Sequence, residues 1–304
     1  ARIMHATQAD IDLMTFPGGP AHGFASFSAT ASNVEVDANS IGRGVPIRIY
    51  MLGRFSVAID GQPVLVNCSG KSNGKAQQRP LALLKALIAF GGRDVTSSQL
   101  CESLWPDSDG DFGFGNLTVT LHRLRHLLRA HAAVLQHDGK LTLNERICWV
   151  DMWHFERAVN DGLRRLTDPA SGNAAELHLR AAFSLYSGHF LSRESDESWM
   201  LMPRLRLKTK FERLVAALSE HLESRERFTG AIDLCLEALE RDPLNESIYR
   251  RLMSCYLKAG ELASVLRIYM RCREALANGL SSPPSTQPES SYLESPRAAM
   301  PWHG

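Results

Sequence analysis

Residues 116–131 read NLTVTLHRLRHLLRAH, and this stretch decides the fold of the N-terminal half of the chain. Its leucines recur at steps of four, three and four residues, which is the spacing of one face of an α-helix. They are Leu117, Leu121, Leu124 and Leu128. The stretch therefore predicts an amphipathic helix whose leucine face packs on a core.

The opposite face of this helix is polar and basic. At about 100° per residue, it carries Thr118, Val119, His122, Arg123 and His126. Arg125 and Arg129 flank this face, and no Asp or Glu occurs between Asn116 and Asp138. Such a face fits a DNA major groove, where Arg pairs with guanine or phosphate and Val meets a thymine methyl group. An ordinary solvated face is the alternative, although such faces usually mix both signs of charge.

Strands and shorter helices are predicted before this helix. The run IRIYMLGRFSVAIDGQPVLV, residues 47–66, predicts a hairpin around the turn Asp60-Gly61. The run PLALLKALIAF, residues 80–90, predicts a helix with Pro80 at its first position and Gly91-Gly92 at its end. Its apolar stripe is Leu81, Leu84, Leu87 and Ile88. Together these patterns predict a hairpin followed by a helix.

Two further segments surround residues 116–131. Thr96 and Gln99 have the spacing of a capping box, which predicts a short helix over residues 97–105. The stretch PDSDGDFGFG, residues 106–115, holds three Asp and three Gly, which argues against a helix there. Residues 133–150 predict a strand, the turn Asp138-Gly139 and a second strand. The predicted order is therefore strands, three helices and a hairpin.

From Met152 to about Leu280 the pattern is almost entirely helical, and two segments align at a spacing of 34 residues. Their small and large apolar residues match the packing positions of tetratricopeptide repeats. In the first repeat these are Val215, Leu218, Leu222, Ala231, Cys235, Ala238 and Pro243. In the second they are Tyr249, Leu252, Tyr256, Val265, Tyr269 and Cys272, with Gly260 at the inter-helix turn. Residues 174–186 and 198–211 predict a looser third pair.

Composition limits the possible functions. The chain has 304 residues and a net charge of +1, which excludes a histone-like polycation. Residues 47–157 carry 13 Lys and Arg against 10 Asp and Glu, an excess of three. The six cysteines are widely spaced, which favours reduced thiols in the cytoplasm over a disulfide scaffold or a zinc site. The longest apolar stretch, residues 81–90, is too short to span a membrane.

Two smaller basic features accompany the helix. Lys75 and Arg79 precede the residue 80–90 stripe, close to Gln77 and Gln78, where they could hold phosphates. The second feature is the hairpin turn from His137 to Lys140, which could lay its basic side chains along a minor groove or a phosphate. Each alone is compatible with a plain polar loop or turn. Three basic features around one helical unit favour DNA binding.

Residues 47–150 resemble the OmpR/PhoB-type winged helix-turn-helix, and residues 151–293 resemble the bacterial transcriptional activator domain. The matching stretches include IRIYMLGRFSVAIDG, KAQQRPLALLKALIAFGGRDVTSSQLCESLWPD, LTVTLHRLRHLLR, DMWHFERAV and YMRCREALANGL. This combination is similar to the Streptomyces antibiotic regulatory protein (SARP) family. The resemblance implies a regulator that binds direct repeats in promoter DNA as side-by-side dimers and contacts RNA polymerase.

The resemblance also assigns residues. It places Thr118, His122, Arg123 and Arg125 on the recognition helix and residues 137–140 on the wing. It matches residues 106–115 to a loop implicated in polymerase contact. The wing of this chain is short and lacks the usual Gly-Gly-Tyr, so the base preference of the family does not carry over. The predicted DNA-binding set is Lys75, Arg79, Thr118, His122, Arg123, Arg125, His126 and Lys140.

Other functions receive less support from the sequence. Gly70-Lys71-Ser72 resembles the end of a nucleotide-binding loop, but Leu65 stands where the leading Gly is needed. His122 and His126 have a metal-compatible spacing without an evident third ligand. We therefore predict no catalytic activity, no cofactor and no bound metal. A helical-repeat adaptor that binds a protein partner without binding DNA is the remaining alternative.

The sequence thus predicts a mainly α-helical protein with small β-sheets. We expect a flexible arm over residues 1–46, a winged helix-turn-helix domain over 47–150, a tetratricopeptide-like activator domain over 151–280 and a Pro/Ser-rich tail over 281–304. The predicted partners are double-stranded promoter DNA, RNA polymerase and a second copy of the chain on DNA, with no membrane. The expected location is the cytoplasm, at the nucleoid.

Overall fold

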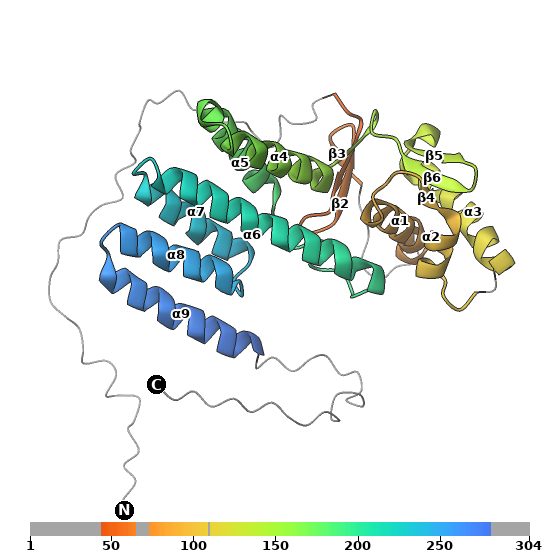
Figure 1. Ribbon diagram of the computed structural model, residues 1–304. Coiled ribbons are helices and arrows are strands. Elements are labelled where there is room, and N and C mark those ends of the chain that lie inside the picture. The colour runs from red at the N-terminus through yellow and green to blue at the C-terminus, as the bar shows by residue number, and fades with distance from the viewer. Residues whose placement is uncertain (1–43, 65–72, 109, 281–304) are drawn as a thin grey trace, which may run out of the picture. The chain divides into compact units, whose positions relative to one another are not determined.

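The computed structural model describes residues 44–64, 73–108 and 110–280 (Figure 1). Side chains at a few positions within these ranges, including Lys75, are not described. Contacts divide the chain into residues 1–35 and 36–304, and every described residue belongs to the second unit. Most of the predicted arm and the whole predicted tail lie outside the described residues. We refer to residues 44–150 as the N-terminal half and to residues 151–280 as the helical half.

The N-terminal half begins with a small sheet. Its strands are β1 (Ile47–Tyr50), β2 (Ser56–Ile59), β3 (Gln62–Pro63) and β7 (Cys148–Val150), in the order β3-β2-β1-β7. Positive φ angles of 50° at Asp60 and 77° at Gly61 make the tight turn predicted between β2 and β3. The prediction is incomplete because a further turn separates β1 from β2. Strand β7 returns from far along the chain to pair parallel with β1.

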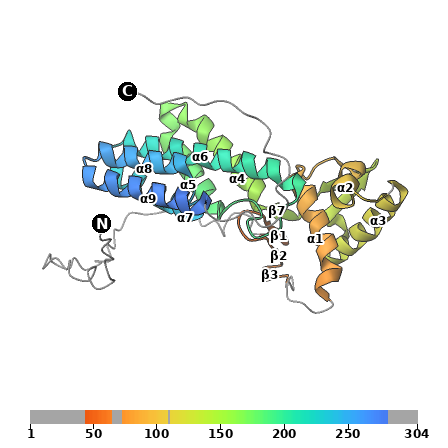
Figure 2. The same cartoon turned by 90° about the horizontal axis from the view of Figure 1, so that it is seen from below.

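Three helices follow the sheet. They are α1 (Asn73–Ala89), α2 (Ser97–Leu104) and α3 (Gly110–Leu127), which group together in Figure 2. The predicted leucine faces of the first and third helices are buried. The predicted cap of α2 is confirmed, since the Thr96 hydroxyl oxygen accepts a hydrogen bond from the Gln99 amide at 3.3 Å. The helix boundaries expected around Pro80 and residues 106–115 are wrong.

Pro80 lies inside α1 and does not start it. A proline lacks the N–H of a helical hydrogen bond and its ring crowds the carbonyl four residues earlier, but its fixed φ is helical, and α1 extends back to Asn73. Similarly, α3 begins at Gly110, within the stretch predicted to be a loop. Gly113 continues the buried leucine face by one turn and lies against Cys101 of α2. This packing outweighs the low helix propensity of glycine.

A β-hairpin follows α3 after a short 3-10 turn, η2 (His131–Ala133). Strands β5 (Val134–His137) and β6 (Lys140–Leu143) pair around Asp138 and Gly139, both at positive φ, as predicted. The short strand β4 (Val95–Thr96) adds to β6, which gives the order β4-β6-β5. The predicted second strand is too long, because Cys148–Val150 leaves the hairpin for the first sheet. Three helices are thus followed by this hairpin, in the predicted order, and the assignment of a winged helix-turn-helix domain stays a prediction.

The helical half contains six helices within the described residues. They are α4 (Asp151–Leu166), α5 (Gly172–Leu185), α6 (Leu201–Glu223), α7 (Phe228–Arg241), α8 (Glu246–Lys258) and α9 (Leu262–Leu280). Figure 1 shows α6 to α9 stacked side by side, and each contacts the next. The pairs α6–α7 and α8–α9 correspond to the two predicted repeats. Gly260 adopts the positive φ of 79° at the α8–α9 turn.

Two predictions for these repeats are wrong. Residues 198–211 do not form a separate helix of a third pair, because most of them belong to α6. Leu207 and Phe211 are fully buried and continue the buried face of α6, so nothing ends the helix between them. The partner of α5 is instead α4. Tyr269 was expected to pack, yet it is 51% exposed, because no described helix covers the outer side of α9.

The two halves are joined through a buried carboxylate. Asp151, the first residue of α4, accepts hydrogen bonds from the amides of Met51, Leu52 and Met152 at 2.6 to 2.9 Å. Met51 and Leu52 directly follow β1, a hundred residues earlier in the chain. Burial raises the pKa of Asp151 to about 7, although the three amide donors act to lower it. The carboxylate therefore ties the end of β1 to the start of α4.

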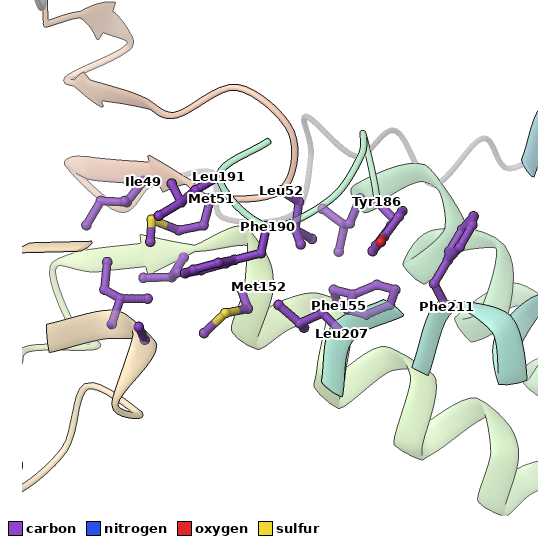
Figure 3. Packing of buried hydrophobic residues seen from close by; sticks show 14 of the residues in the cluster. Ile49, Met51, Leu52, Met152, Phe155, Tyr186, Phe190, Leu191, Leu207 and Phe211 are labelled. Carbon is purple, nitrogen blue, oxygen red and sulfur yellow. The ribbon is translucent and has the colours of Figure 1, made fainter. Parts of the chain in front are cut away.

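Apolar packing surrounds this carboxylate. Figure 3 shows buried side chains running from β1 past Phe190 and Phe155 to Leu207 and Phe211 of α6. The segment before α6 pairs with the residues after β1, through the Leu52–Phe190 bridge. Lys85 of α1 forms a 2.8 Å ion pair with Glu194 in the same region. One continuous core thus crosses the boundary predicted at residue 150, and the division into two domains stays a prediction.

Gly92 is needed where α1 meets the helical half. Its φ is 74°, and an added Cβ would lie 2.2 Å from the ring of Trp153 in α4. Its carbonyl also accepts a hydrogen bond from Leu143 of the hairpin at 2.7 Å. The neighbouring Gly91 has a φ of 104°, with no atom within 4 Å of its added Cβ. Both glycines thus adopt a positive φ, but only Gly92 lacks room for a Cβ.

We predict that Gly92→Ala lowers the free energy of unfolding by about 2–5 kcal/mol, because it adds overpacking against Trp153 to the strain of a positive φ. Gly91→Ala should lower it by only about 1–2 kcal/mol, since strain alone operates there. Urea unfolding of both variants measures the difference. Equal losses would show that Trp153 moves aside at no cost.

The raised pKa of Asp151 predicts a pH dependence. Its pKa is about 7 when folded and near 3.8 when unfolded, so its contribution to stability is largest below pH 4 and is lost as pH rises toward 7. Relative to Asp151→Asn, the wild-type free energy of unfolding should fall by up to about 1.4 kcal/mol per pH unit in this window. Urea unfolding from pH 4 to 8 provides the measurement, and parallel profiles would contradict the prediction.

Candidate nucleic-acid interface

The face of α3 opposite its leucines is exposed. Its residues, here called the outer face, are Thr118, Val119, His122, Arg123 and His126, and all five are exposed. Leu117, Leu121, Leu124 and Leu128 on the opposite side are at most 3% exposed. The predicted orientation of the helix is therefore confirmed. The contact of these side chains with DNA stays a prediction.

The outer face is cationic and open. No acidic residue lies on α3 beyond Asp111, and Arg123 and Arg129 form no ion pair with another described residue. The Thr118 hydroxyl donates to the Phe114 carbonyl at 3.0 Å, so its oxygen remains available as an acceptor. This surface can meet an anion with arginine and histidine side chains, and it can accept a hydrogen bond through Thr118.

Arg125 differs from the other predicted residues. Its side chain is half-buried, and its Nε and one terminal nitrogen donate to the Val134 carbonyl at 3.0 and 2.7 Å. Its own carbonyl accepts from Ala130 at 3.2 Å, while Arg129 takes a positive φ of 52° at the helix end. Arg125 therefore fastens the end of α3 to the first strand of the hairpin.

The hairpin turn lies at the other side of the same unit. Lys140 is exposed directly after the turn, and His137 lies 3.0 Å from the carboxylate of Asp138. The Gly139 carbonyl accepts from the Ser97 amide at 2.8 Å, which joins the turn to the start of α2. The hairpin is thus held by α2 at its turn and by Arg125 near its base. This fixes the position of Lys140 relative to α3.

The two residues predicted near the start of α1 have different outcomes. The Arg79 guanidinium is exposed and donates to the Leu104 carbonyl at the end of α2, at 3.0 Å. This bond links α1 to α2 and leaves other guanidinium N–H groups for a phosphate. Lys75 lies within α1, and its side chain is outside the described set. Lys71, four residues before Lys75, lies outside the described residues.

Sequence reasoning missed an exposed apolar feature beside the outer face. Phe112 is 75% exposed and Phe114 is 45% exposed, both on the first turns of α3. The two phenylalanines lay in the stretch assigned to a loop, so their shared helix was not foreseen. The role of Arg125 in holding the hairpin was also missed. The sequence gives no signal that the N–H donors of Arg125 are bonded to a backbone carbonyl.

The described residues hold no cluster of three or more metal-ligating side chains. Burial raises the pKa of the Cys101 thiol, and it raises that of Cys148 to about 12. Both sulfurs therefore remain protonated, and a thiol is a weak nucleophile and a weak metal ligand.

Across the described helices, none combines the length and apolar composition required to cross a membrane.

A family model described as the bacterial transcriptional activator domain matches residues 150–293. The helical half is therefore similar to the bacterial transcriptional activator domain. The match begins at the last residue of β7, next to the Asp151 junction. No curated protein sequence matches the chain.

Solved structures show a likeness of fold. Mycobacterium tuberculosis EmbR, in complex with a low affinity phosphopeptide, is 20% identical with a TM-score of 0.59. The likeness covers 77% of this chain and only 61% of the EmbR chain. MamA AMB-1 is 17% identical over 68% of this chain and 96% of its own, with a TM-score of 0.22. The EmbR likeness confirms a mainly helical fold with small sheets.

Substitutions of Arg125 and Arg123 should differ in their effect on stability, because only Arg125 holds the hairpin. Arg125→Ala removes two charged hydrogen bonds to the buried Val134 and should lower the free energy of unfolding by about 1–3 kcal/mol. Arg123→Ala removes an exposed side chain and should change it by less than about 0.5 kcal/mol. Thermal and urea unfolding of both variants checks this. If Arg125→Ala leaves the free energy of unfolding unchanged, the bond to Val134 does not stabilise the fold.

Proposed function

We propose that this protein is a transcriptional regulator that binds double-stranded promoter DNA through α3 and the β5–β6 hairpin. One observation carries the proposal: the acid-free outer face of α3 is exposed beside a fixed hairpin, in a chain whose residues 150–293 match the bacterial transcriptional activator domain. In this arrangement α3 enters the major groove and the hairpin follows the neighbouring backbone.

The individual side chains have separate roles in this proposal. Arg123 pairs with a guanine edge or a phosphate, and Val119 contacts a thymine methyl group. Thr118 accepts a hydrogen bond from a base amino group, because its own proton is already donated to Phe114. His122 and His126 contact the backbone or base edges beside Arg123. These contacts supply the sequence-dependent part of the binding.

Phosphate contacts position the protein on the duplex. Lys140 follows the hairpin turn and is exposed, so it reaches the backbone or minor groove next to α3. Arg79 and Lys75 contribute phosphate contacts from α1. We assign Arg125 a positioning role, since its guanidinium holds the hairpin against α3.

The proposal includes protein partners. Exposed Phe112 and Phe114 lie in the stretch that resembles a polymerase-contacting loop, and their exposure supports a protein contact there. RNA polymerase is the partner we propose for them, with a second copy of the chain bound beside the first on DNA. The protein then acts in the cytoplasm at the nucleoid, without enzymatic activity.

A second function, that of a protein-binding adaptor, is favoured by α9. Its outer side exposes a stripe of apolar residues, Leu262, Leu266, Tyr269 and Met270, which are at least 50% exposed. Stripes of this kind mark surfaces that other proteins cover. An adaptor would use this surface and would have no need of the outer face of α3.

DNA selection separates the two functions. Fragments selected from a random duplex library should bind the wild type, and Arg123→Ala should lose about 1–3 kcal/mol of binding free energy. Affinity should fall steeply as salt concentration rises, because phosphate contacts release counterions. Arg213→Ala, which removes an exposed arginine of α6, is the matched control and should leave DNA binding unchanged. An adaptor would retain no fragment at any salt concentration.

A further inference from the structure

A groove lies between the C-terminal part of α3 and the β2–β3 hairpin. Its volume is about 840 Å³, within the range of small-molecule sites. The lining residues from the hairpin are Ile59, Gln62, Pro63 and Val64. Those from α3 and the residues after it are His122, Arg125, His126, Leu127, Arg129, Ala130 and His131. No acidic residue is among them.

The groove combines apolar walls with positive charge. Five of the eleven lining residues have apolar side chains, and these come from both sides of the groove. Arg125 and Arg129 bring two permanent charges, and neither forms an ion pair with another described residue. The partner of Arg125 is the neutral carbonyl of Val134, so its charge is not cancelled. A bound molecule must therefore match apolar surface and cation together.

The backbone at the end of α3 is fixed, and so is the guanidinium of Arg125. Arg129 stands at a φ of 52° where α3 ends, and the bond from Ala130 to the Arg125 carbonyl closes that end at 3.2 Å. Arg125 is further held by Val134 at 2.7 Å. Groups that are fixed before binding lose less conformational entropy when a ligand arrives.

We propose that this groove binds an amphiphilic organic anion, such as an acyl or aryl carboxylate, in competition with DNA. The apolar body of the anion packs on Pro63, Val64 and Leu127, and its anionic head lies at Arg129. A DNA phosphate would satisfy the charge but would leave the apolar walls in water. A neutral apolar molecule would leave the arginines without a counter-charge.

Competition with DNA follows from shared residues and rests on the proposed function. His122 and His126 line the groove and also belong to the outer face of α3. A molecule in the groove covers one side of both histidines and places a negative charge beside the DNA-binding surface. Arg123 does not line the groove and stays exposed. The anion would therefore act as an effector that releases DNA.

Calorimetric titration with sodium decanoate below its micelle concentration tests the site. We expect one bound decanoate per chain and weaker binding of the neutral amide, decanamide. Arg129→Gly should reduce decanoate affinity by about tenfold, because glycine keeps the positive φ and removes the cation. Gln62→Glu, an isosteric change at an exposed lining residue, should weaken binding through repulsion. Arg123→Ala should bind decanoate like the wild type.

The outcomes separate this site from the proposed function. Absence of decanoate binding, or binding that Arg129→Gly and Gln62→Glu leave unchanged, overturns the groove assignment. DNA affinity that decanoate does not reduce overturns the competition. A wild type that binds decanoate in the groove but retains no DNA fragment overturns the proposed function and leaves the groove assignment standing. Circular dichroism confirms that each variant is folded.

Discussion

The carboxylate of Asp151 satisfies backbone amides that the rest of the fold cannot reach. Met51 and Leu52 turn away from β1 inside the core, where an amide without an acceptor is costly. Asp151 supplies that acceptor at the first turn of α4, so the end of β1 and the first helix of the helical half are fixed together. The packing around Phe155 and Phe190 then completes a shared core.

Local patterns were sufficient to predict most elements of the fold. The leucines of α3, the cap at Thr96 and the turn Asp138-Gly139 are signals contained within a few residues, and each was confirmed. The failures involve contacts between distant segments. Strand β7 pairs with β1 across a hundred residues, and the early start of α3 depends on Gly113 meeting Cys101. No local pattern encodes such pairings.

The candidate site shows the same division. Helical periodicity was enough to predict that Arg123 and His122 are exposed, because exposure follows from the position of the leucines. It could not separate Arg125 from Arg123, since the acceptor at Val134 lies across a loop. The groove was equally hidden, because Pro63 and Arg129 belong to segments with no common pattern. The exposure of charged side chains could thus be predicted from the sequence, whereas the groups that they contact could not.

The shared core around Asp151 also limits how the chain can be divided. A fragment that ends at residue 150 would lose the acceptor for Met51 and Leu52 and would bare the apolar side chains that face α4. A fragment that starts at residue 151 would lose two of the three amide donors to the Asp151 carboxylate, those of Met51 and Leu52. Any recombination or engineered fusion that exchanges one half for a homologous one must therefore keep an acceptor at residue 151 for these two backbone amides and match the apolar side chains of the shared core.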